Sequence, residues 1–593
     1  MPVLNKIKRA LRGEVKLTTA AREALRRSRV SLQQRKERAK LDEIEHLALT
    51  PAFSRMSADE LAEYFRGPRE AKFFEHSWAS QGFDEQSLGK EIQWRRDPLS
   101  NYVWPLDYHR DIKLLRTDGS DIRVLWELNR LGHFLPLACA YASTRDERYS
   151  AEFITQLKGW NEQNPYGRGP NWTCAMEVAL RAINLLAAFE VFRYSPQMPV
   201  EFFLQLLQQH GTYIRRNLEF SYLATSNHYL SDVVGLLWLG LLLPELRDAA
   251  AWREFGLDQM LREMDKQVLP DGADFEASTG YHRFVTELFL YSFLLCRANS
   301  VEIKPRYWSR LHQMLSYIRA YVRPDGFAPL IGDTDGGQVL PFVRRAADDH
   351  AYLLDILKPE TPPVASQAFP HAGTYIMRDG DLYLCFNASD AGINGRGSHG
   401  HNDVLSIEVS AGGRAIIVDP GTYVYSANLA KRHEFRSTAY HSTVQIDGLE
   451  QNTIHVDTPF VIGNEAKPRV LEWKTSDDFD KVVGEHYGYP VTHRRTVTFD
   501  KRARMWVIDD EFFGDGEHVY EARFHFAPAL DVRVNGASVA AGGLVVALLN
   551  SEVEPVLENQ SASIDYGQMS DSVSACWKIS GKPRKLTWQI KSV

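Results

Sequence analysis

The chain has 593 residues, of which 44% are hydrophobic and 24% are charged. This length exceeds what one hydrophobic core usually organises, so we expect two or three domains, and the composition excludes wholesale disorder. The net charge of −7 argues against a general nucleic-acid-binding protein.

The first 40 residues differ from the rest, because thirteen Lys or Arg face three Glu there, a net charge of +10. The segment is interpreted as a solvated basic helix, with a tether to an anionic membrane surface or glycan as the alternative. Its charges interrupt any signal-peptide core, and no stretch reaches the roughly 18 apolar residues of a transmembrane span. Five scattered cysteines favour a reducing compartment. We therefore expect a cytoplasmic location, with a periplasmic or secreted one as the alternative.

From about residue 50 to 355 the apolar residues recur at helical spacing. The clearest helical patterns cover residues 176–192, 202–218, 229–243, 284–298 and 307–322. Connections rich in Gly, Pro and Asn, such as 164–170, separate them. This pattern predicts helical hairpins stacked in an arc or ring, whose concave side would form a cleft. Prolines crowded between 359 and 370 predict a linker.

After this linker, short runs of β-forming residues alternate with turns such as Asp379-Gly380 and Asp447-Gly448. Alternation with such turns predicts antiparallel sheets, and hence a β-sandwich. The expected fold is α+β and multidomain. A basic helical segment over 1–45 precedes a helical catalytic domain over 46–360 and a sandwich domain over 371–593.

The densest polar motif is Ser398-His-Gly-His-Asn-Asp403, which directly precedes a predicted strand. On an extended segment His399 and His401 point to the same side. Downstream, Asp419 ends one strand and His441 precedes another. Two imidazoles and a carboxylate would suit Zn²⁺ with water as the fourth ligand, whereas the alternative is that the histidines only cap turns.

Two further motifs lie at the beginning of predicted helices. Asn227 and His228 open an apolar helix, where Ser226 or Asn227 could simply be the N-cap. Tyr281 lies in a loop that follows Glu276, a placement typical of functional residues, although a buried structural tyrosine is the alternative.

Two pairs of charged residues receive structural interpretations. Glu177 and Arg181 are four residues apart on one helix, which favours a surface ion pair. Asp333 and Asp335 suggest a Ca²⁺ site or paired carboxylates. Their segment lacks the later ligands of an EF-hand loop, so a turn is favoured.

In this order, the motifs resemble the heparinase II/III family of polysaccharide lyases, whose members have an incomplete (α/α) toroid followed by an antiparallel β-sandwich. The resemblance covers the chain from about Trp104 to its end. One departure is Ser442, which stands where the family usually carries Asn. The matching segments are Trp126-Glu127-x-x-Arg130, Asn171-Trp172 with Glu177 and Arg181, Asn227-His228, Glu276 to Tyr281, His399-Gly-His401-x-Asp403, Asp419-Pro-Gly-Thr-Tyr423 and Arg436-x-Thr-x-x-His441.

The resemblance implies cleavage of a uronate-containing polysaccharide by β-elimination. Glycosaminoglycans such as heparan sulfate, hyaluronan or chondroitin are the first expectation, and alginate or a bacterial exopolysaccharide is the alternative. The implied residues are Asn227, His228, Tyr281 and His399 for catalysis, Asn171, Trp172, Glu276, His282 and Arg283 for substrate binding, and His401, Asp419 and His441 for a structural metal, expected to be zinc.

The chemistry explains why such groups are needed. The C5 proton of a uronate is weakly acidic, and each preorganised donor to the developing charge is typically worth about 3–4 kcal/mol. If the leaving oxygen lies syn to this proton, Tyr281 could act as base and then acid; if anti, His399 would be the base. As a base, Tyr281 would need positive or hydrogen-bonding neighbours, for which His282, Arg283 and His399 are candidates.

Two other classes of function remain open. A glycoside hydrolase on the same toroid would use Glu276 with Asp333 or Asp335 as its acid and base. A non-catalytic glycan-binding or assembly protein would bind without forming product.

Overall fold

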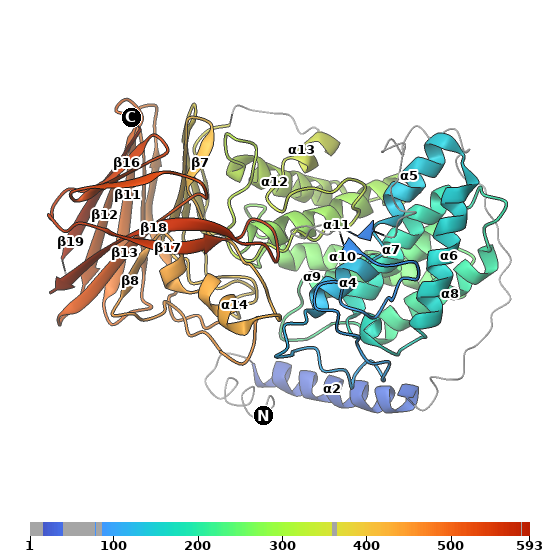
Figure 1. Ribbon diagram of the computed structural model, residues 1–593. Coiled ribbons are helices and arrows are strands. Elements are labelled where there is room, and N and C mark those ends of the chain that lie inside the picture. The colour runs from blue at the N-terminus through green and yellow to red at the C-terminus, as the bar shows by residue number, and fades with distance from the viewer. Residues whose placement is uncertain (1–15, 39–76, 79–85, 358–363, 583, 593) are drawn as a thin grey trace.

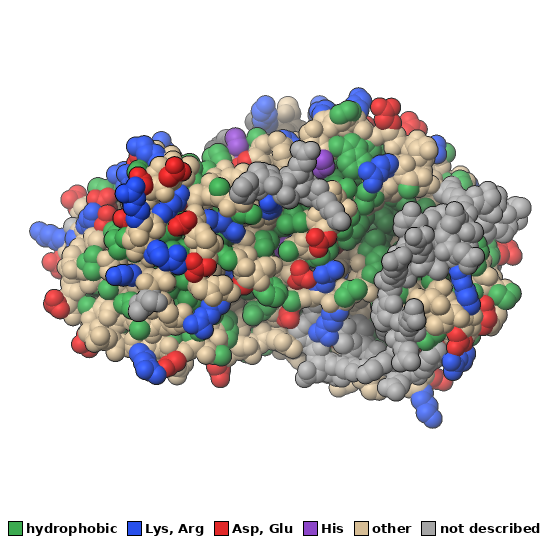
Figure 2. All heavy atoms as spheres, turned by 90° about the horizontal axis from the view of Figure 1, so that it is seen from above, with side chains coloured by type: hydrophobic (Ala, Val, Ile, Leu, Met, Phe, Trp, Pro, Cys, Tyr) green, Lys and Arg blue, Asp and Glu red, His purple; other side chains and the backbone are tan. Residues whose placement is uncertain are grey.

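The computed structural model describes residues 16–38, 77–78, 86–357, 364–582 and 584–592. A helical body and a body of β-sheets lie side by side in an elongated molecule (Figure 1). Within the described ranges, no helix combines the length and apolar character needed to cross a bilayer. The space-filling view shows charged side chains of both signs over the sheet body, and a hollow with many hydrophobic side chains in the helical body (Figure 2).

The helical body is built around two central helices. α7 and α9 are buried over nearly their whole circumference, whereas helices such as α8 and α12 bury one face and expose the other. The helices are α4 (Ile122–Asn129), α5 (Phe134–Thr144), α6 (Glu147–Gln163), α7 (Ala175–Phe192), α8 (Val200–Arg216), α9 (Asn227–Leu242), α10 (Ala249–Gln267), α11 (Thr279–Ala298), α12 (Pro305–Tyr321) and α13 (Tyr352–Leu357). A short hairpin of β1 (Ser77–Trp78) and β2 (Gln86–Ser87) precedes them.

The predicted basic segment contains helix α2 (Leu17–Arg38), which lies along the outside of the helical body (Figure 1). Glu23 is its buried anchor, because the carboxylate accepts hydrogen bonds from Arg26, Arg27 and the backbone N–H of Tyr222. The rest of the predicted segment, residues 1–15 and 39–45, lies outside the described residues.

The second body contains an eight-stranded and a nine-stranded sheet in the described chain, and all pairs within them are antiparallel. The first has the order β14-β15-β16-β19-β12-β11-β10-β9, and the second β17-β18-β13-β7-β6-β5-β4-β3, with β8 paired to β13. The strands are β3 (Gln367–Phe369), β4 (Thr374–Asp379), β5 (Leu382–Asn387), β6 (Ser406–Ala411), β7 (Arg414–Ile417), β8 (Val444–Ile446), β9 (Arg469–Thr475), β10 (Phe479–His486), β11 (Thr492–Asp500), β12 (Met505–Phe513), β13 (His518–Phe526), β14 (Val532–Asn535), β15 (Ser538–Ala541), β16 (Leu544–Leu548), β17 (Val556–Ala562), β18 (Ser570–Gly581) and β19 (Lys585–Ser592).

The sandwich core follows from alternation along the strands. β11 and β12 bury every second side chain, as expected for strands with one face toward a core. Trp506, Trp577 and Trp588 are fully buried there. The predicted order, a helical toroid followed by an antiparallel sandwich, is therefore confirmed.

The two bodies share a continuous apolar contact. The core of the helical body extends to sandwich-domain residues such as Tyr383, Tyr425 and Tyr566. At this joint the Asp121 carboxylate accepts hydrogen bonds from the hydroxyls of Tyr566, at 2.5 Å, and Ser426, at 2.9 Å. The sandwich begins with β3, inside the stretch interpreted as a linker, because these residues pair with β4.

Candidate functional site

Tyr281 lies in the first turn of α11, and the prediction that it lies in a loop is wrong. The hydroxyl of Ser278 caps this helix and accepts a hydrogen bond from the Tyr281 N–H at 3.0 Å. A Cβ on Gly280 would lie 2.9 Å from the carbonyl oxygen of Asp333, so only glycine permits this close approach. The Tyr281 hydroxyl donates to Asp335 at 3.2 Å and lies 3.3 Å from the Tyr425 hydroxyl.

His399 lies directly against this tyrosine. The two rings stack with centroids 3.5 Å apart and an angle of 14°. The His399 Nδ1 is 2.9 Å from a carboxylate oxygen of Asp333, and Nε2 is 3.4 Å from Glu276. Gly332 permits the close approach of the two loops, because it has φ +67° and a Cβ there would lie 2.8 Å from the carbonyl oxygen of His399.

Asn227 completes the group from the beginning of α9. Ser226 is the N-cap of this helix, which leaves the Asn227 side chain free to contact Glu276. Its Nδ2 donates to both Glu276 oxygens, at 2.8 and 3.0 Å, while its buried Oδ1 has no hydrogen-bond partner among the residues that the structure describes. Asn227, Glu276, His399 and Tyr281 therefore form one continuous chain of contacts, which the structure brings together from both domains.

The protonation of Tyr281 follows from its surroundings. Burial and the carboxylates of Asp335 and Asp333 raise the pKa of Tyr281 well above its usual value, against the opposing charge of Arg123. The phenol therefore keeps its proton at neutral pH.

The expected neighbours His282 and Arg283 do not support Tyr281. His282 accepts from the backbone N–H of Asp274 at 3.0 Å, and its other ring nitrogen lies 3.1 Å from the Met314 carbonyl. Arg283 donates to Glu287 at 3.1 Å and to a backbone carbonyl. Both side chains are buried inside the helical domain, so this placement argues against the substrate contact predicted for them.

Asn171 and Trp172 are also placed in the interior. Asn171 is fully buried and donates to the side-chain oxygens of Asn129 and Asn164, both at 2.8 Å. Trp172 is buried as well, and its indole N–H donates to the Asn164 carbonyl at 3.1 Å. Neither side chain has surface to offer to a polysaccharide, which argues against their predicted role in binding.

The predicted surface ion pair between Glu177 and Arg181 is wrong. Both side chains are buried, and Glu177 instead binds Arg130 through two hydrogen bonds of 2.8 Å. Arg181 donates to His210 at 3.0 Å and to backbone carbonyls. The spacing rule for helical pairs assumes a solvated face, and α7 has none.

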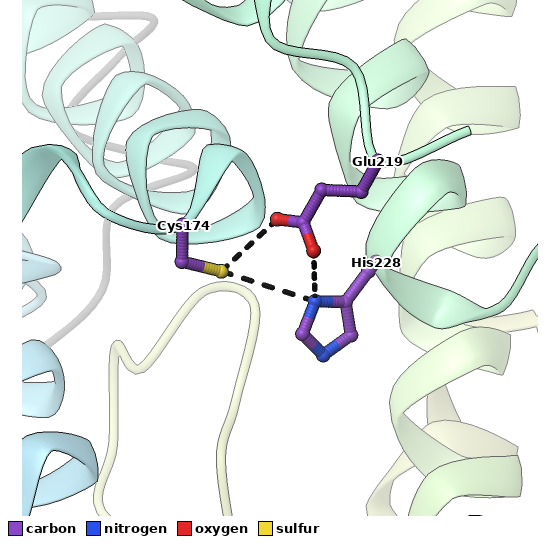
Figure 3. A group of neighbouring side chains, drawn as sticks. All are labelled: Cys174, Glu219 and His228. Atoms are coloured by element: carbon purple, nitrogen blue, oxygen red, sulfur yellow. Dashed lines mark hydrogen bonds and ion pairs between the residues drawn. The ribbon is translucent and has the colours of Figure 1, made fainter. Parts of the chain in front are cut away.

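His228 is the partly exposed neighbour of Asn227. Its Nδ1 lies 2.7 Å from a Glu219 carboxylate oxygen and 3.8 Å from the sulfur of Cys174 (Figure 3). Burial alone would lower the pKa of His228, but the charge of Glu219 outweighs it and raises the pKa to about 9.

Asp333 belongs to the site although the sequence pattern there favours only a turn. Its buried carboxylate binds His399, His401 and, through two hydrogen bonds, Arg432 on α14 (Leu429–Phe435). Burial by itself would raise the pKa of Asp333, but the Arg432 charge and the two imidazoles hold it well below its usual value. The sequence around Asp333 does not predict this role, since its partner Arg432 is 99 residues away along the chain.

The predicted metal ligands lie together next to the Asp333 carboxylate. The ligand atoms of His401, Asp419 and His441 are within 4.8 Å of one another, and all three residues are buried. Asp333 binds Nε2 of His401, and Asp419 binds Nδ1 of His441 at 2.7 Å. Among the described residues, Nδ1 of His401 and Nε2 of His441 are buried without a hydrogen-bond partner. Because Asp419 contacts Nδ1 of His441, the orphaned Nδ1 of His401 next to this pair fits a metal ion held by two imidazoles and a carboxylate.

Comparisons with known proteins cover both domains. The family description "Heparinase II/III N-terminus" matches residues 2–348, and "Heparinase II/III-like, C-terminal" matches residues 361–575. A heparin-sulfate lyase of Pedobacter heparinus is 26% identical over 490 residues, which is 76% of this chain and 71% of that protein. A heparin-sulfate lyase of Bacteroides stercoris is 24% identical over 477 residues, 72% of this chain and 68% of that protein.

Solved structures show the same fold. A heparinase III crystal structure superimposes with a TM-score of 0.70 at 17% identity, covering 94% of this chain and 88% of its own. A heparan sulfate lyase mutant from Pedobacter heparinus gives 0.59 at 22% identity, covering 100% and 91%. Because the family descriptions match most of the chain and its two-domain fold agrees with theirs, the chain belongs to the heparinase II/III family of polysaccharide lyases.

Proposed function

We propose that this lyase cleaves a uronate-containing glycosaminoglycan by β-elimination, with heparan sulfate as the first substrate to test. The observation that most supports this proposal is the chain of contacts from Asn227 through Glu276 to His399 and Tyr281. It puts an amide, an imidazole and a protonated phenol within one group, as the elimination of a uronate requires. The names of the relatives, which are heparin-sulfate lyases, support the substrate class.

The surroundings of His399 favour it as the base. Asp333 lies 2.9 Å from Nδ1 and can hold a proton there, so Nε2, which lies 3.4 Å from Glu276, would accept the C5 proton. This is the role that a carboxylate plays behind the histidine of a hydrolase triad.

Tyr281 then serves as the acid. Its raised pKa keeps the phenol protonated until the leaving oxygen takes the proton. The division of roles fits a uronate whose C5 proton lies anti to the leaving group.

Asn227 would neutralise the substrate carboxylate. Its Nδ2 donates to Glu276, so a substrate carboxylate would have to share or replace this contact. Such a donor preferentially stabilises the charge that develops after proton removal, and one donor is typically worth about 3–4 kcal/mol.

His401, Asp419 and His441 would hold a structural zinc ion in this proposal. When bound, the ion would supply positive charge next to the segment that carries His399 and would fix the positions of its three ligands. Asp333 would connect the two, because it binds His399 on one oxygen and His401 on the other. The residues that hold the ion would therefore position the base indirectly.

The test is a panel of heparan sulfate, hyaluronan, chondroitin, alginate and a bacterial uronate exopolysaccharide. Ultraviolet absorbance of the unsaturated uronate follows the reaction, and a reducing-sugar assay runs in parallel. We expect absorbance to rise with heparan sulfate and not with the Tyr281→Phe variant. Reducing ends without absorbance would instead favour a hydrolase. Absorbance only with alginate would mean that the substrate is alginate and not a glycosaminoglycan.

A further inference from the structure

A second group of potential metal ligands lies in the helical domain and includes His228, the sequence neighbour of Asn227. Cys174 precedes α7, Glu219 follows α8 and His228 belongs to the first turn of α9 (Figure 3). Their sulfur, oxygen and nitrogen atoms lie within 4.8 Å of one another. Three separate segments thus bring a thiol, a carboxylate and an imidazole to one point.

The distances in this group are close to those of a zinc coordination sphere. Bonds of about 2.3 Å to sulfur and about 2.0–2.1 Å to nitrogen and oxygen place neighbouring tetrahedral ligands roughly 3.3–3.6 Å apart. Here the sulfur of Cys174 is 3.1 Å from Glu219 and 3.8 Å from Nδ1 of His228, and the latter two are 2.7 Å apart. A shift of roughly half an ångström would admit the ion.

The carboxylate is already oriented by its surroundings. One oxygen of Glu219 accepts from the backbone N–H of Met176 at 3.1 Å, which leaves the other directed at His228. Its backbone N–H donates to Asp232 at 2.7 Å. Metal-binding carboxylates usually have such supporting hydrogen bonds.

The negative charge around the group also favours a bound cation. Asp232 is fully buried, and its second oxygen has no hydrogen-bond partner in the described part of the chain. Glu219 and Glu276 both act electrostatically on His228. In the chain as described, Asp232 has one hydrogen-bond donor, the Glu219 backbone N–H, and a divalent ion at Glu219 would offset the negative charge gathered there.

Access from solvent exists on one side. The side chains of His228 and Glu219 are 36% and 29% exposed, while Cys174 is buried behind them. An ion can therefore enter and keep water as its fourth ligand.

From these contacts we propose that Cys174, Glu219 and His228 form a second metal site, for a thiophilic divalent ion such as Zn²⁺. On binding, Cys174 releases its thiol proton to solvent and binds as the thiolate. His228 releases the Nδ1 proton that faces Glu219 to solvent and binds through Nδ1, and Glu219 binds as the carboxylate. The site differs from the one in the sandwich domain by its sulfur ligand.

This sulfur ligand gives a specific test that requires no activity. The full-length protein is stripped with a chelator, dialysed, and titrated with Co²⁺, whose thiolate complexes show a sulfur-to-metal charge-transfer band in the near ultraviolet. We expect the band to appear and about two equivalents to bind per chain. The Cys174→Ser variant should lose the band and about one equivalent, whereas His441→Ala should lose an equivalent and keep the band.

Two outcomes would overturn the proposal. One is a titration of the wild type without the charge-transfer band, which would mean that the three residues form only hydrogen bonds. The other is a band that persists in Cys174→Ser, which would assign it to another cysteine. Glu219→Gln guards against misfolding of the serine variant, because it keeps the thiol and should weaken Co²⁺ binding at least tenfold with an unchanged circular dichroism spectrum.

Discussion

Replacement of Asp333 by asparagine should damage both stability and turnover. The carboxylate is fully buried and, within the described part of the chain, is the only one paired with Arg432, which it binds through two hydrogen bonds. Asparagine keeps the volume but removes the charge, so Arg432 is left buried without a counter-charge. Breaking a buried pair in this way typically costs about 3–5 kcal/mol, a large part of the roughly 5–15 kcal/mol that stabilises a typical protein.

The same substitution should disturb His399, the proposed base. The new amide would present either a donor or a weaker acceptor to His399, so a proton on Nδ1 is held less firmly than by the Asp333 carboxylate. We expect kcat to fall by a factor of about 10²–10⁴, with a smaller change in KM.

Urea unfolding followed by circular dichroism, and initial rates from ultraviolet absorbance, would measure the two effects. Arg432→Met and the double variant Asp333→Asn/Arg432→Met complete a cycle in which the double variant should be more stable than the sum of the single losses predicts. A loss below about 1 kcal/mol together with wild-type kcat would refute the reasoning.

Three shorter predictions concern other parts of the chain. Tyr281→Phe should lower kcat at least about 100-fold. The urea midpoint should move little, since the lost hydroxyl makes two long hydrogen bonds in the described structure. Retained turnover would show that Tyr281 is not the acid. Burial and then Arg181 lower the pKa of His210 to about 3, so the folded state binds a proton less readily than the unfolded state, and stability is lost as pH falls below 6.5. The loss is about 1.4 kcal/mol per pH unit, and His210→Gln should flatten this slope in unfolding measured between pH 4 and 7. Metal analysis of His441→Ala should show one equivalent fewer and a lower melting temperature, whereas equal metal content in both proteins would contradict the sandwich site.

The sequence predicts the architecture because periodicity changes visibly along the chain. Helical spacing up to about 355 and alternation after 370 are local patterns, and both survive in the structure as α4 to α13 and β3 to β19. The motifs around Asn227, Tyr281 and His399 are also recognisable, because chemically active residues stand at helix and strand beginnings with glycine nearby. Their convergence could be expected from the resemblance, whereas spacing along the chain does not predict it.

The remaining errors have one physical origin, which is burial that a local pattern does not show. Arg181 and Glu177 have a spacing typical of a surface pair, yet α7 is enclosed on all sides. Asn171 is a polar residue in a Gly- and Pro-rich connection, yet it is fully buried in a network of asparagines. Asp333 acquires its role only through partners that lie 66 to 99 residues away.

The joint between the domains should also influence catalysis, through Tyr566. Its hydroxyl donates to Asp121 in the helical domain and accepts from the backbone N–H of Tyr425, whose own hydroxyl contacts Tyr281. Tyr566→Phe keeps the ring but leaves Asp121 short of a donor, which typically costs about 1–3 kcal/mol.

We expect this variant to unfold at lower urea and to show a reduced kcat, because Tyr425 is less firmly placed against Tyr281. The matched control is Tyr520→Phe in the sandwich domain, where the buried hydroxyl has no hydrogen-bond partner among the described residues, so its removal should lower neither the urea midpoint nor kcat. If Tyr566→Phe behaved like this control in both assays, the joint would hold the domains together by apolar contact alone, and the contacts from Asp121 through Tyr566 and Tyr425 would not influence Tyr281.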